Sequence, residues 1–395
     1  MVWSIEREDR VDLKRKPILW GLDKDELFFG CFVLFVGIVK GGPELDIIPP
    51  AMSKLLLIIG ILPMCIKILR TSYTKNEWFI IIFMGLLAII STLFTHRLGL
   101  MLVIVMILGA KNMKVSRILN MFLTLQVVTF LIAVIPQVIK LALGGTVNGI
   151  LYENRDIYGV VEVTDQFRIS LGYGHPNALQ QNVCFLSILL ICCMSHEIKK
   201  WQIALITVFN LSFYFLTYSN TGLTIYLLFL LFYFIWRYNK TFINMIGKYS
   251  PYIFILLTAV NILIVACFTG STWMMKLDSI MVGRLHWAHE FMMSLGFSFW
   301  GRDIAEANIG YEYLDNGYVF LLLRYGVIIF VLYIIAVYKL LSYLYRKNQL
   351  LAIIVIGVVH VYFIMENFML AGLYNLTYIY LAPALYEVSY FRKDG

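Results

Sequence analysis

The sequence YVFLLLRYGVIIFVLYIIAV, residues 318–337, decides the fold class of this chain. It holds one charged side chain, that of Arg324, among apolar and aromatic residues. A helix that crosses the hydrocarbon core of a membrane needs about 20 mainly apolar residues, so this stretch predicts a transmembrane helix. The whole chain agrees, because 61% of its 395 residues are hydrophobic and only 14% are charged, whereas soluble proteins carry about 25% charged residues.

Apolar runs of this kind recur along the whole chain. They predict an all-α polytopic membrane protein that forms one membrane domain over residues 1–395. We expect about twelve transmembrane helices, with the count open by one or two because two of the runs are short. The predicted spans are Leu27–Val39, Leu55–Leu69, Trp78–Phe94, Leu98–Leu108, Ile118–Ile139, Ala178–Met194, Gln202–Tyr218, Thr221–Trp236, Tyr252–Phe268, Tyr318–Val337, Leu350–Ile364 and Gly372–Tyr386.

Lysine and arginine gather in alternate connecting segments, which predicts the orientation of the chain. Because cytosolic loops are enriched in these residues, we expect both termini in the cytosol and the chain in the cytoplasmic membrane, without a cleavable signal peptide. The same alternation explains the net charge of +8 without a nucleic acid partner. The cations of the predicted inner loops include Lys67, Arg70, Lys75, Lys111, Lys114, Arg117, Lys199, Lys200, Arg237, Lys240, Lys248, Lys339, Arg346 and Lys347.

Two predicted outward-facing loops are long, at residues 140–177 and 269–317. Long ordered loops are usually functional. The charged residues of note gather in these loops, whereas the spans are almost free of charge. This distribution favours chemistry at the outer face of the membrane over a transport path through it.

The first long loop ends in RISLGYGHPN, residues 168–177, directly before a span. Alternating residues on both sides of Asp165 predict a β-hairpin that turns there. Pro176 suits the first turn of a helix, and such a helix start attracts anions such as phosphate. Arg168 adds a planar group that fits phosphate oxygens. The alternative is a glycine-rich turn that caps a helix, with Arg168 meeting lipid headgroups.

The second long loop contains GRLHWAHEFMM, residues 283–293. Apolar residues at helical spacing predict an amphipathic helix along the membrane surface, with Arg284 near its start. His286, His289 and Glu290 lack a further ligand at a convincing spacing, so we predict no metal site. The six cysteines fall within apolar runs and are interpreted as core residues.

The same loop closes with DNGYVFLLLRYG, residues 315–326. Asp315 is either the N-cap of the next helix or a general base at the outer mouth of the site. Arg324 lies about 9 Å deeper along that helix than Tyr318, at a position where an arginine either faces a polar cavity or extends to the headgroups. Two smaller polar pairs lie on the same side: His96 with Arg97, and Glu366 with Asn367. Each pair is either a helix terminus only or part of the site, where Arg97 would add a further cation.

Together, these motifs resemble the Wzy-type polysaccharide polymerases and O-antigen ligases, membrane glycosyltransferases of the GT-C class. The likeness rests on three stretches that lie in the family's order on the outer side. They are Arg168 with the Gly-His-Pro-Asn sequence at 174–177, Arg284 with Trp287 and the Phe-Trp-Gly-Arg sequence at 299–302, and the Asp-Asn-Gly-Tyr sequence at 315–318 with Tyr325 and Gly326. O-antigen ligases typically carry histidine where this chain has Asp315, which favours a polymerase.

The resemblance implies an inverting glycosyltransferase that needs no metal and no cofactor. Its donor is a growing glycan on a polyprenyl pyrophosphate, and its acceptor is one repeat unit on the same lipid. Arg168 and Arg284 would stabilise the leaving pyrophosphate, and Asp315, or failing that His175, would accept the proton of the acceptor hydroxyl. The residues expected to support substrate binding are Asn177, Tyr318, Asn316, Arg302, Arg97 and Arg324.

Two other functions stay open. A ligase would transfer the finished glycan to a different acceptor, which the sequence does not identify. A flippase for lipid-linked oligosaccharides suits twelve spans equally well, although transporters often contain internal repeats and none is evident here. For a polymerase, the resemblance also implies a flippase and a chain-length regulator as partners.

Overall fold

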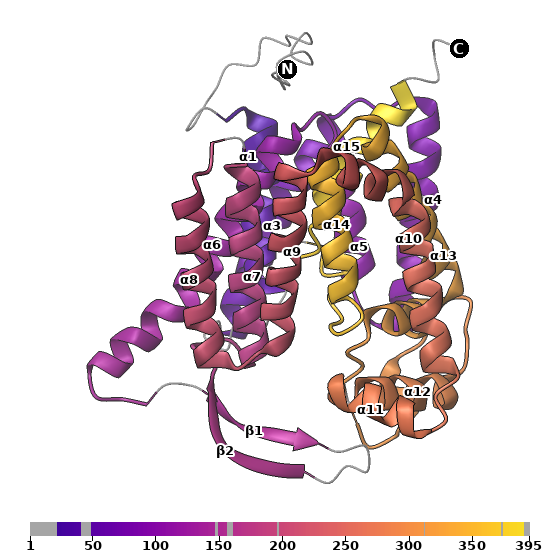
Figure 1. Ribbon diagram of the computed structural model, residues 1–395. Coiled ribbons are helices and arrows are strands. Elements are labelled where there is room, and N and C mark those ends of the chain that lie inside the picture. Colours follow the sequence, from indigo (N-terminus) through magenta and orange to yellow (C-terminus); the bar gives the residue numbers. More distant parts are fainter. Residues whose placement is uncertain are drawn as a thin grey trace.

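The computed structural model describes residues 22–40, 49–146, 149–155, 161–195, 197–311, 313–372 and 374–390. Within these residues the chain is mainly helical, with a two-stranded sheet outside the helix bundle (Figure 1). The first elements are α1 (Lys24–Cys31), the π-helical turn η2 (Phe32–Val36), α2 (Gly37–Lys40), α3 (Pro50–Arg70), α4 (Lys75–Thr95), α5 (Gly99–Gly109), α6 (Val115–Ala142), β1 (Gly149–Arg155), β2 (Val161–Ile169) and α7 (Pro176–Cys193). They are followed by α8 (Lys200–Thr217), α9 (Asn220–Tyr238), α10 (Lys240–Ala266), α11 (Thr272–Ile280), α12 (Arg284–Leu295), the short 3-10 helix η3 (Ile304–Ala307), α13 (Gly317–Arg346), α14 (Leu350–Tyr362) and α15 (Thr377–Tyr390).

All twelve predicted spans overlap helices, so the predicted fold class, a helical membrane protein, is confirmed. Among the described residues, seven helices are long and apolar enough to cross a membrane: α3, α4, α6, α7, α9, α10 and α13. The apolar helices α5 and α14 are shorter. The number twelve and the GT-C arrangement therefore remain predictions.

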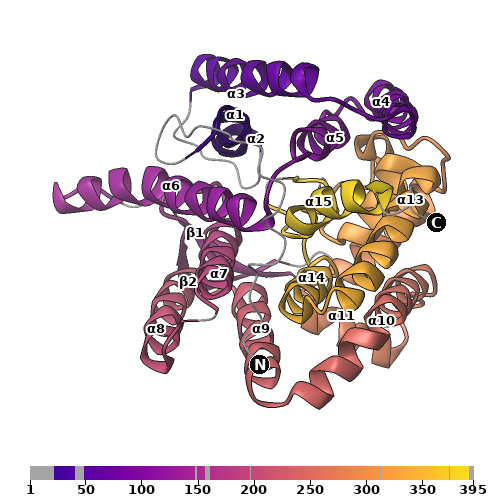
Figure 2. The same ribbon diagram turned by 90° about the horizontal axis from the view of Figure 1, so that it is seen from above.

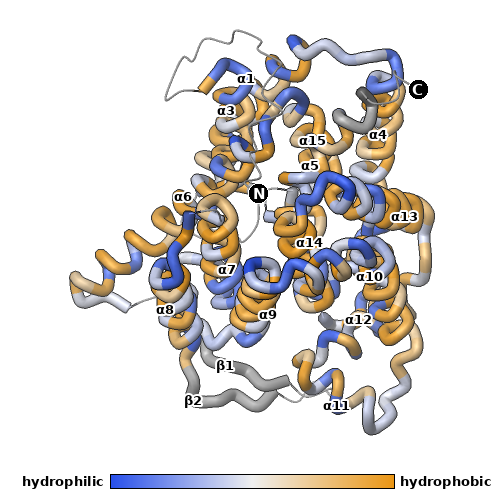
Figure 3. Tube along the Cα trace, turned by 45° about the horizontal axis from the view of Figure 1, so that its top comes forward, coloured by the Kyte–Doolittle hydropathy of each residue, from blue (hydrophilic) through white to orange (hydrophobic). Residues whose placement is uncertain are grey.

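The ends of the bundle differ in what they carry. The start of α1 and the end of α15 lie at one end, whereas β1, β2, α11 and α12 lie at the opposite end (Figure 1). Apolar residues cover the shafts of the helices and hydrophilic residues gather towards the turns (Figure 3). This relative arrangement agrees with the alternation of basic loops, and we call the end with β1, β2, α11 and α12 the outer end.

The first long loop contains a β-hairpin, but the predicted pairing of residues 158–163 with residues 167–171 about a turn at Asp165 is wrong, because β1 pairs with β2. Asp165 lies inside β2, and the strands are joined through residues 156–160, which lie outside the described residues. The antiparallel register shifts between the pairs Leu151–Phe167 and Glu153–Val163, so β2 contains extra residues around Asp165. A bulge of this kind lets a strand continue through an interrupted alternation pattern.

The predicted amphipathic helix is α12, but its apolar face packs on protein instead of on the membrane surface. Leu285, Ala288 and Met292 are at most 5% exposed. They pack with residues from the end of α10 and the start of α13, such as Val265 and Val319. Because this face is used inside the fold, α12 is held rigidly beside the outer end of α13.

A break in α13 separates its first turns from the rest. Gly326 has φ +85° and ψ 167°, a conformation outside the helical region. Backbone N–H groups freed by the break donate to the preceding loop, with Val327 bonded to the Ser298 carbonyl at 2.9 Å. The Arg302 N–H donates to the Arg324 carbonyl at 3.1 Å. The break therefore anchors residues 298–302 against α13.

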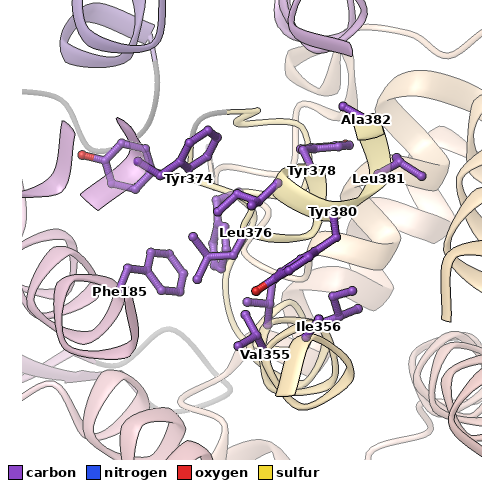
Figure 4. Packing of buried hydrophobic residues seen from close by; sticks show 14 of the residues in the cluster. Phe185, Val355, Ile356, Tyr374, Leu376, Tyr378, Tyr380, Leu381 and Ala382 are labelled. Carbon is purple, nitrogen blue, oxygen red and sulfur yellow. The ribbon is translucent and has the colours of Figure 1, made fainter. Parts of the chain in front are cut away.

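The centre of the bundle contains a segment between α14 and α15 that is non-helical over its described residues, 363–372 and 374–376. The twelfth predicted span therefore becomes helical only at Thr377 and not at Gly372. Tyr374 and Leu376 of this segment pack among Phe185, Val355 and other buried side chains (Figure 4). Irregular backbone inside a membrane is tolerated where protein surrounds it. Here α15 contacts α5, α6, α13 and α14, seen from above in Figure 2.

Buried hydrogen bonds hold this segment in place. The side-chain amide of Asn375 donates to the Met369 carbonyl at 2.8 Å, and the Tyr378 hydroxyl donates to the same oxygen at 3.1 Å. The Asn375 amide also donates to the Tyr333 hydroxyl at 3.3 Å. These bonds replace the helical hydrogen bonds that the segment lacks.

Lys67, a cation of the predicted inner loops, is fully buried. Its ammonium donates to the carbonyls of Gly109 and Lys111, the latter at 3.1 Å, where α5 ends. We expect Lys67→Met to lower the free energy of unfolding by about 2 kcal/mol, because those carbonyls lose their donor in a buried place. Thermal unfolding of the purified protein in detergent measures this. The control is Lys54→Met, an exposed position on the same helix, and equal unfolding temperatures for both variants would contradict the role of Lys67.

Candidate functional site

Arg284 is the centre of a polar cluster at the outer end. Its Nη2 donates to Glu366 Oε1 at 2.9 Å and its Nε donates to Asp315 Oδ2 at 3.3 Å. Its Nη1 lies 3.4 Å from the Thr221 hydroxyl on α9. The Arg284 guanidinium thus connects α12 to three other parts of the chain. These are Thr221 on α9, Asp315 directly before α13, and Glu366 in the turn after α14. The side chains are partly buried: their exposed fractions are 12% for Arg284, 29% for Asp315 and 17% for Glu366.

The seat of Arg284 is built by local sequence. Arg284 is the first residue of α12, and Gly283 before it has φ +76°. Asp278, fully buried on α11, accepts hydrogen bonds from the N–H groups of Leu285 at 2.8 Å and His286 at 3.2 Å. A carboxylate at this position satisfies the free N–H groups of a helix start. Asp278 therefore fixes the direction in which α12 presents its first side chain.

Arg168 reaches the same cluster from β2. Its Nε donates to the Thr217 carbonyl at the end of α8 at 2.6 Å, and its Nη2 donates to Asn177 Oδ1 at 2.5 Å. The amide of Asn177 in turn donates to Glu366 Oε1 at 3.4 Å. Asn177 therefore connects the two arginine environments through one carboxyl group.

His175 caps α7, because its Nδ1 accepts the N–H of Asn177 at 3.1 Å. His175 keeps part of its surface exposed. Partial loss of solvent around the ring and the positive charges of Arg168 and Arg284 lower the pKa of His175 to about 4. The imidazole is therefore neutral at neutral pH. We call Arg168, His175, Asn177, Arg284, Asp315 and Glu366 the outer cluster.

The carboxyl groups of the outer cluster have unequal surroundings. Burial raises the pKa of Glu366 to about 7 against the attraction of Arg284, and the nearby Asp315 carboxylate adds to the increase. Near neutral pH the protonation of Glu366 therefore sets the net charge of the cluster. With Glu366 protonated, two guanidinium groups face one carboxylate, and the cluster attracts anions.

The structure places several predicted site residues elsewhere. Asn316 is the N-cap of α13, with its Oδ1 accepting the Val319 N–H at 3.1 Å, so Asp315 is not the cap. Tyr318 is 1% exposed, and its hydroxyl donates to the His360 carbonyl at 2.9 Å inside the bundle. The structure does not bring Tyr318 into the outer cluster.

The remaining predicted arginines gather at the break in α13. Arg324 is 3% exposed, and its Nη2 donates to Asp303 Oδ1 at 3.2 Å and to the Thr95 carbonyl at 3.3 Å. Arg97 lies close enough to Arg324 to interact with it electrostatically. Arg302 bonds to Arg324 through its backbone. These residues support the loop before α13, and Arg324 reaches protein partners instead of headgroups.

The histidines of α12 have protein neighbours of their own. The Nδ1 of His289 lies 2.8 Å from the Val265 carbonyl, and Phe268 packs against the rings of both His286 and His289. Among the described residues, no three His, Cys, Asp or Glu side chains are grouped to hold a metal ion.

Sequence reasoning missed the two carboxylates that organise the cluster. The sequence pattern marks Glu366 only as a polar residue at the outer end of an apolar run, and it indicates no role for Asp278. A signal existed for Glu366, because an acidic residue directly after an apolar run is costly unless it has a partner. Asp278 had no such signal, since its role depends on how α11 packs against the start of α12.

The opposite pKa shifts of Glu366 and His175 predict a pH dependence of stability. The pKa of Glu366 rises from 4.5 to about 7 on folding, so its contribution to stability is complete below pH 4.5 and is lost as the pH rises through 7. His175 falls from 6.5 to about 4, so its contribution is complete above pH 6.5 and is lost as the pH falls through 4. The two slopes oppose each other between 4.5 and 6.5.

Above pH 6.5, Glu366 is the one of these two groups whose titration still changes the stability. We expect the wild-type unfolding temperature to decrease as the pH rises through about 7, and Glu366→Gln to remove most of this decrease. Thermal unfolding across neutral pH tests this. Glu306→Gln, an exposed carboxylate on η3, is the control and should keep the wild-type profile. A Glu366→Gln profile parallel to that of the wild type would show that Glu366 does not titrate in this range.

Comparison of the chain with protein-family models, with curated protein sequences and with solved structures returned no match.

Proposed function

We propose that this protein is a membrane glycosyltransferase that polymerises polyprenyl-pyrophosphate-linked repeat units on the outer face of the cytoplasmic membrane. The observation that carries the proposal is the position of Arg284, held between Asp315 and Glu366 at the outer end and linked through Asn177 to Arg168. Three stretches far apart in the sequence, each part of the family resemblance, contribute to this one cluster. Two arginines beside carboxyl groups suit a reaction that releases a phosphate anion and a proton.

In the proposed reaction, a sugar hydroxyl of the acceptor attacks the anomeric carbon of the donor. The bond from that carbon to the pyrophosphate oxygen breaks, and the lipid pyrophosphate leaves with the bonding electrons. Arg284 and Arg168 would stabilise the charge that develops on this oxygen. For Arg284 to bind phosphate, it must give up its contact with Asp315 or with Glu366. The carboxylate that is released is then free to act as the base.

The hydroxyl proton goes to a carboxylate of the outer cluster. Asp315 is the more exposed of the two carboxyl groups, at 29% against 17% for Glu366. A general base works best when its pKa lies near the working pH, and the pKa of Glu366 is about 7. We therefore add Glu366 to Asp315 as a candidate base. His175 is less suited, because its Nδ1 already accepts the Asn177 N–H as the cap of α7.

The test is the polyprenyl-linked glycan profile of cells that lack the protein, complemented with wild type or with variants. The variants are Arg284→Lys, which keeps the charge, Glu366→Gln and Asp315→Asn. Lys276→Ala, an exposed cation on α11, is the control. We expect single repeat units to accumulate on the outer leaflet without the protein, and long chains to return with wild type and with the control.

Arg284→Lys should reduce chain formation at least tenfold, because a lysine cannot replace the two-pronged contact of a guanidinium. Repeat units that accumulate on the cytosolic leaflet would instead identify a flippase. A normal lipid-linked polymer that fails to reach its final acceptor would identify a ligase.

A further inference from the structure

A group of uncharged polar side chains lies deep between α6, α7 and the 363–376 segment. Its members are Gln126, Thr129, Tyr173, Asn182 and Tyr374, each at most 2% exposed. We call them the α6–α7 polar set. Asn182 lies on α7 about 7.5 Å deeper than Asn177 of the outer cluster, given the rise of about 1.5 Å per residue.

Hydrogen bonds join this set across three parts of the chain. The amide nitrogen of Asn182 donates to Gln126 Oε1 at 2.6 Å and to the Thr129 hydroxyl at 2.9 Å. The Tyr374 hydroxyl lies 3.4 Å from the same nitrogen and 3.5 Å from the Thr129 oxygen. The Tyr173 hydroxyl lies near the Thr129 hydroxyl and Tyr374 but completes no hydrogen bond with either. The set is therefore one connected group.

Three buried atoms of this group have no hydrogen-bond partner among the described residues: Gln126 Nε2, Asn182 Oδ1 and the Tyr173 hydroxyl. Exchanging the oxygen and nitrogen of either amide group does not change this number of unpartnered atoms. In each amide only one of the two polar atoms has a hydrogen-bond partner, so the other stays unpaired in either orientation. A buried polar group without a partner is destabilising, and hydrocarbon around the bundle supplies no donor or acceptor. Something polar must meet these atoms.

We propose that the α6–α7 polar set binds ordered water. The unpartnered atoms comprise an amide donor, an amide acceptor and a hydroxyl that serves as either. Water matches this mixture, since it donates and accepts, and buried waters typically make about three hydrogen bonds to such groups. A cation would meet only acceptors, so the amide donor of Gln126 disfavours it. The bound water would bridge α6, α7 and the loop with Tyr173 that precedes α7, and this site does not depend on the proposed function.

Radiolytic labelling of the purified protein tests the proposal. A short X-ray pulse in detergent solution produces hydroxyl radicals from water, and a buried side chain is modified only when a water molecule lies beside it. We expect labelling of Tyr173 and Tyr374 at least fivefold above Tyr318, a buried tyrosine whose hydroxyl has a partner in the His360 carbonyl. Tyr313, which is 66% exposed, shows that the pulse works. Mass spectrometry of the peptides reads all four residues.

The variants Asn182→Leu and Gln126→Met identify what holds the water. Each should reduce labelling of Tyr173 and Tyr374 to the level of Tyr318, and the second serves if the first does not fold. Labelling of Tyr173 and Tyr374 no higher than that of Tyr318 in the wild type would overturn the proposal. Unchanged labelling in a folded variant would overturn it as well, because the amides would then not be the ligands.

Discussion

Replacing Arg284 by alanine is expected to lower the free energy of unfolding by about 3 kcal/mol, because it leaves the partly buried carboxyl groups of Asp315 and Glu366 without their cation. The measurement is thermal or denaturant unfolding of the purified protein at pH 8. Lys276→Ala, which removes an exposed cation at the same end, should change stability by less than about 0.5 kcal/mol.

A second variant separates the lost ion pairs from lost packing. Combining Arg284→Met with Asp315→Asn and Glu366→Gln removes all three charges, and it should recover most of the stability that Arg284→Ala loses. Recovery would support the view that the alanine variant suffers from unpaired carboxylates. If Arg284→Ala is as stable as the control, the guanidinium does not hold the cluster together, and the central role of Arg284 fails.

Replacing Gly326 by alanine should be strongly destabilising, with a loss of about 4 kcal/mol or more. Gly326 has φ +85° and ψ 167°, which side chains other than glycine adopt only under strain. A Cβ atom there would lie 2.4 Å from the Gly301 nitrogen and from the Phe299 carbonyl oxygen. Both are backbone atoms, so the loop at 298–302 would have to leave α13.

The matched control is Gly357→Ala on α14, where an added Cβ meets no atom within 4 Å. In a helix interior this change should stabilise the protein by about 0.5–1 kcal/mol. Unfolding temperatures of the two variants in detergent, and their elution as monodisperse protein, provide the test. A Gly326→Ala variant that unfolds at the wild-type temperature would show that the break in α13 is dispensable.

The candidate site was predictable to the extent that its residues carry unusual chemistry at a membrane boundary. Arg168, Asn177, Arg284 and Asp315 stood out because each is polar beside an apolar run, and the structure brings them together. Tyr318 was assigned to the same site from its neighbours in the sequence. One turn of helix directs it into the bundle, where its hydroxyl meets the His360 carbonyl. A residue's neighbours in sequence therefore do not settle which way its side chain faces.

The sequence by itself determined that this is a helical membrane protein and where most of its long helices lie. Those properties follow from the length and composition of apolar runs, which are local. Only the tertiary structure decided that Glu366 joins Arg284, that α12 packs on protein, and that residues 363–376 are not helical inside the bundle. These features depend on contacts between segments far apart in the chain, such as Asn177 with Glu366. A local pattern cannot encode them, because the same apolar stripe can bury itself equally well against lipid or against another helix.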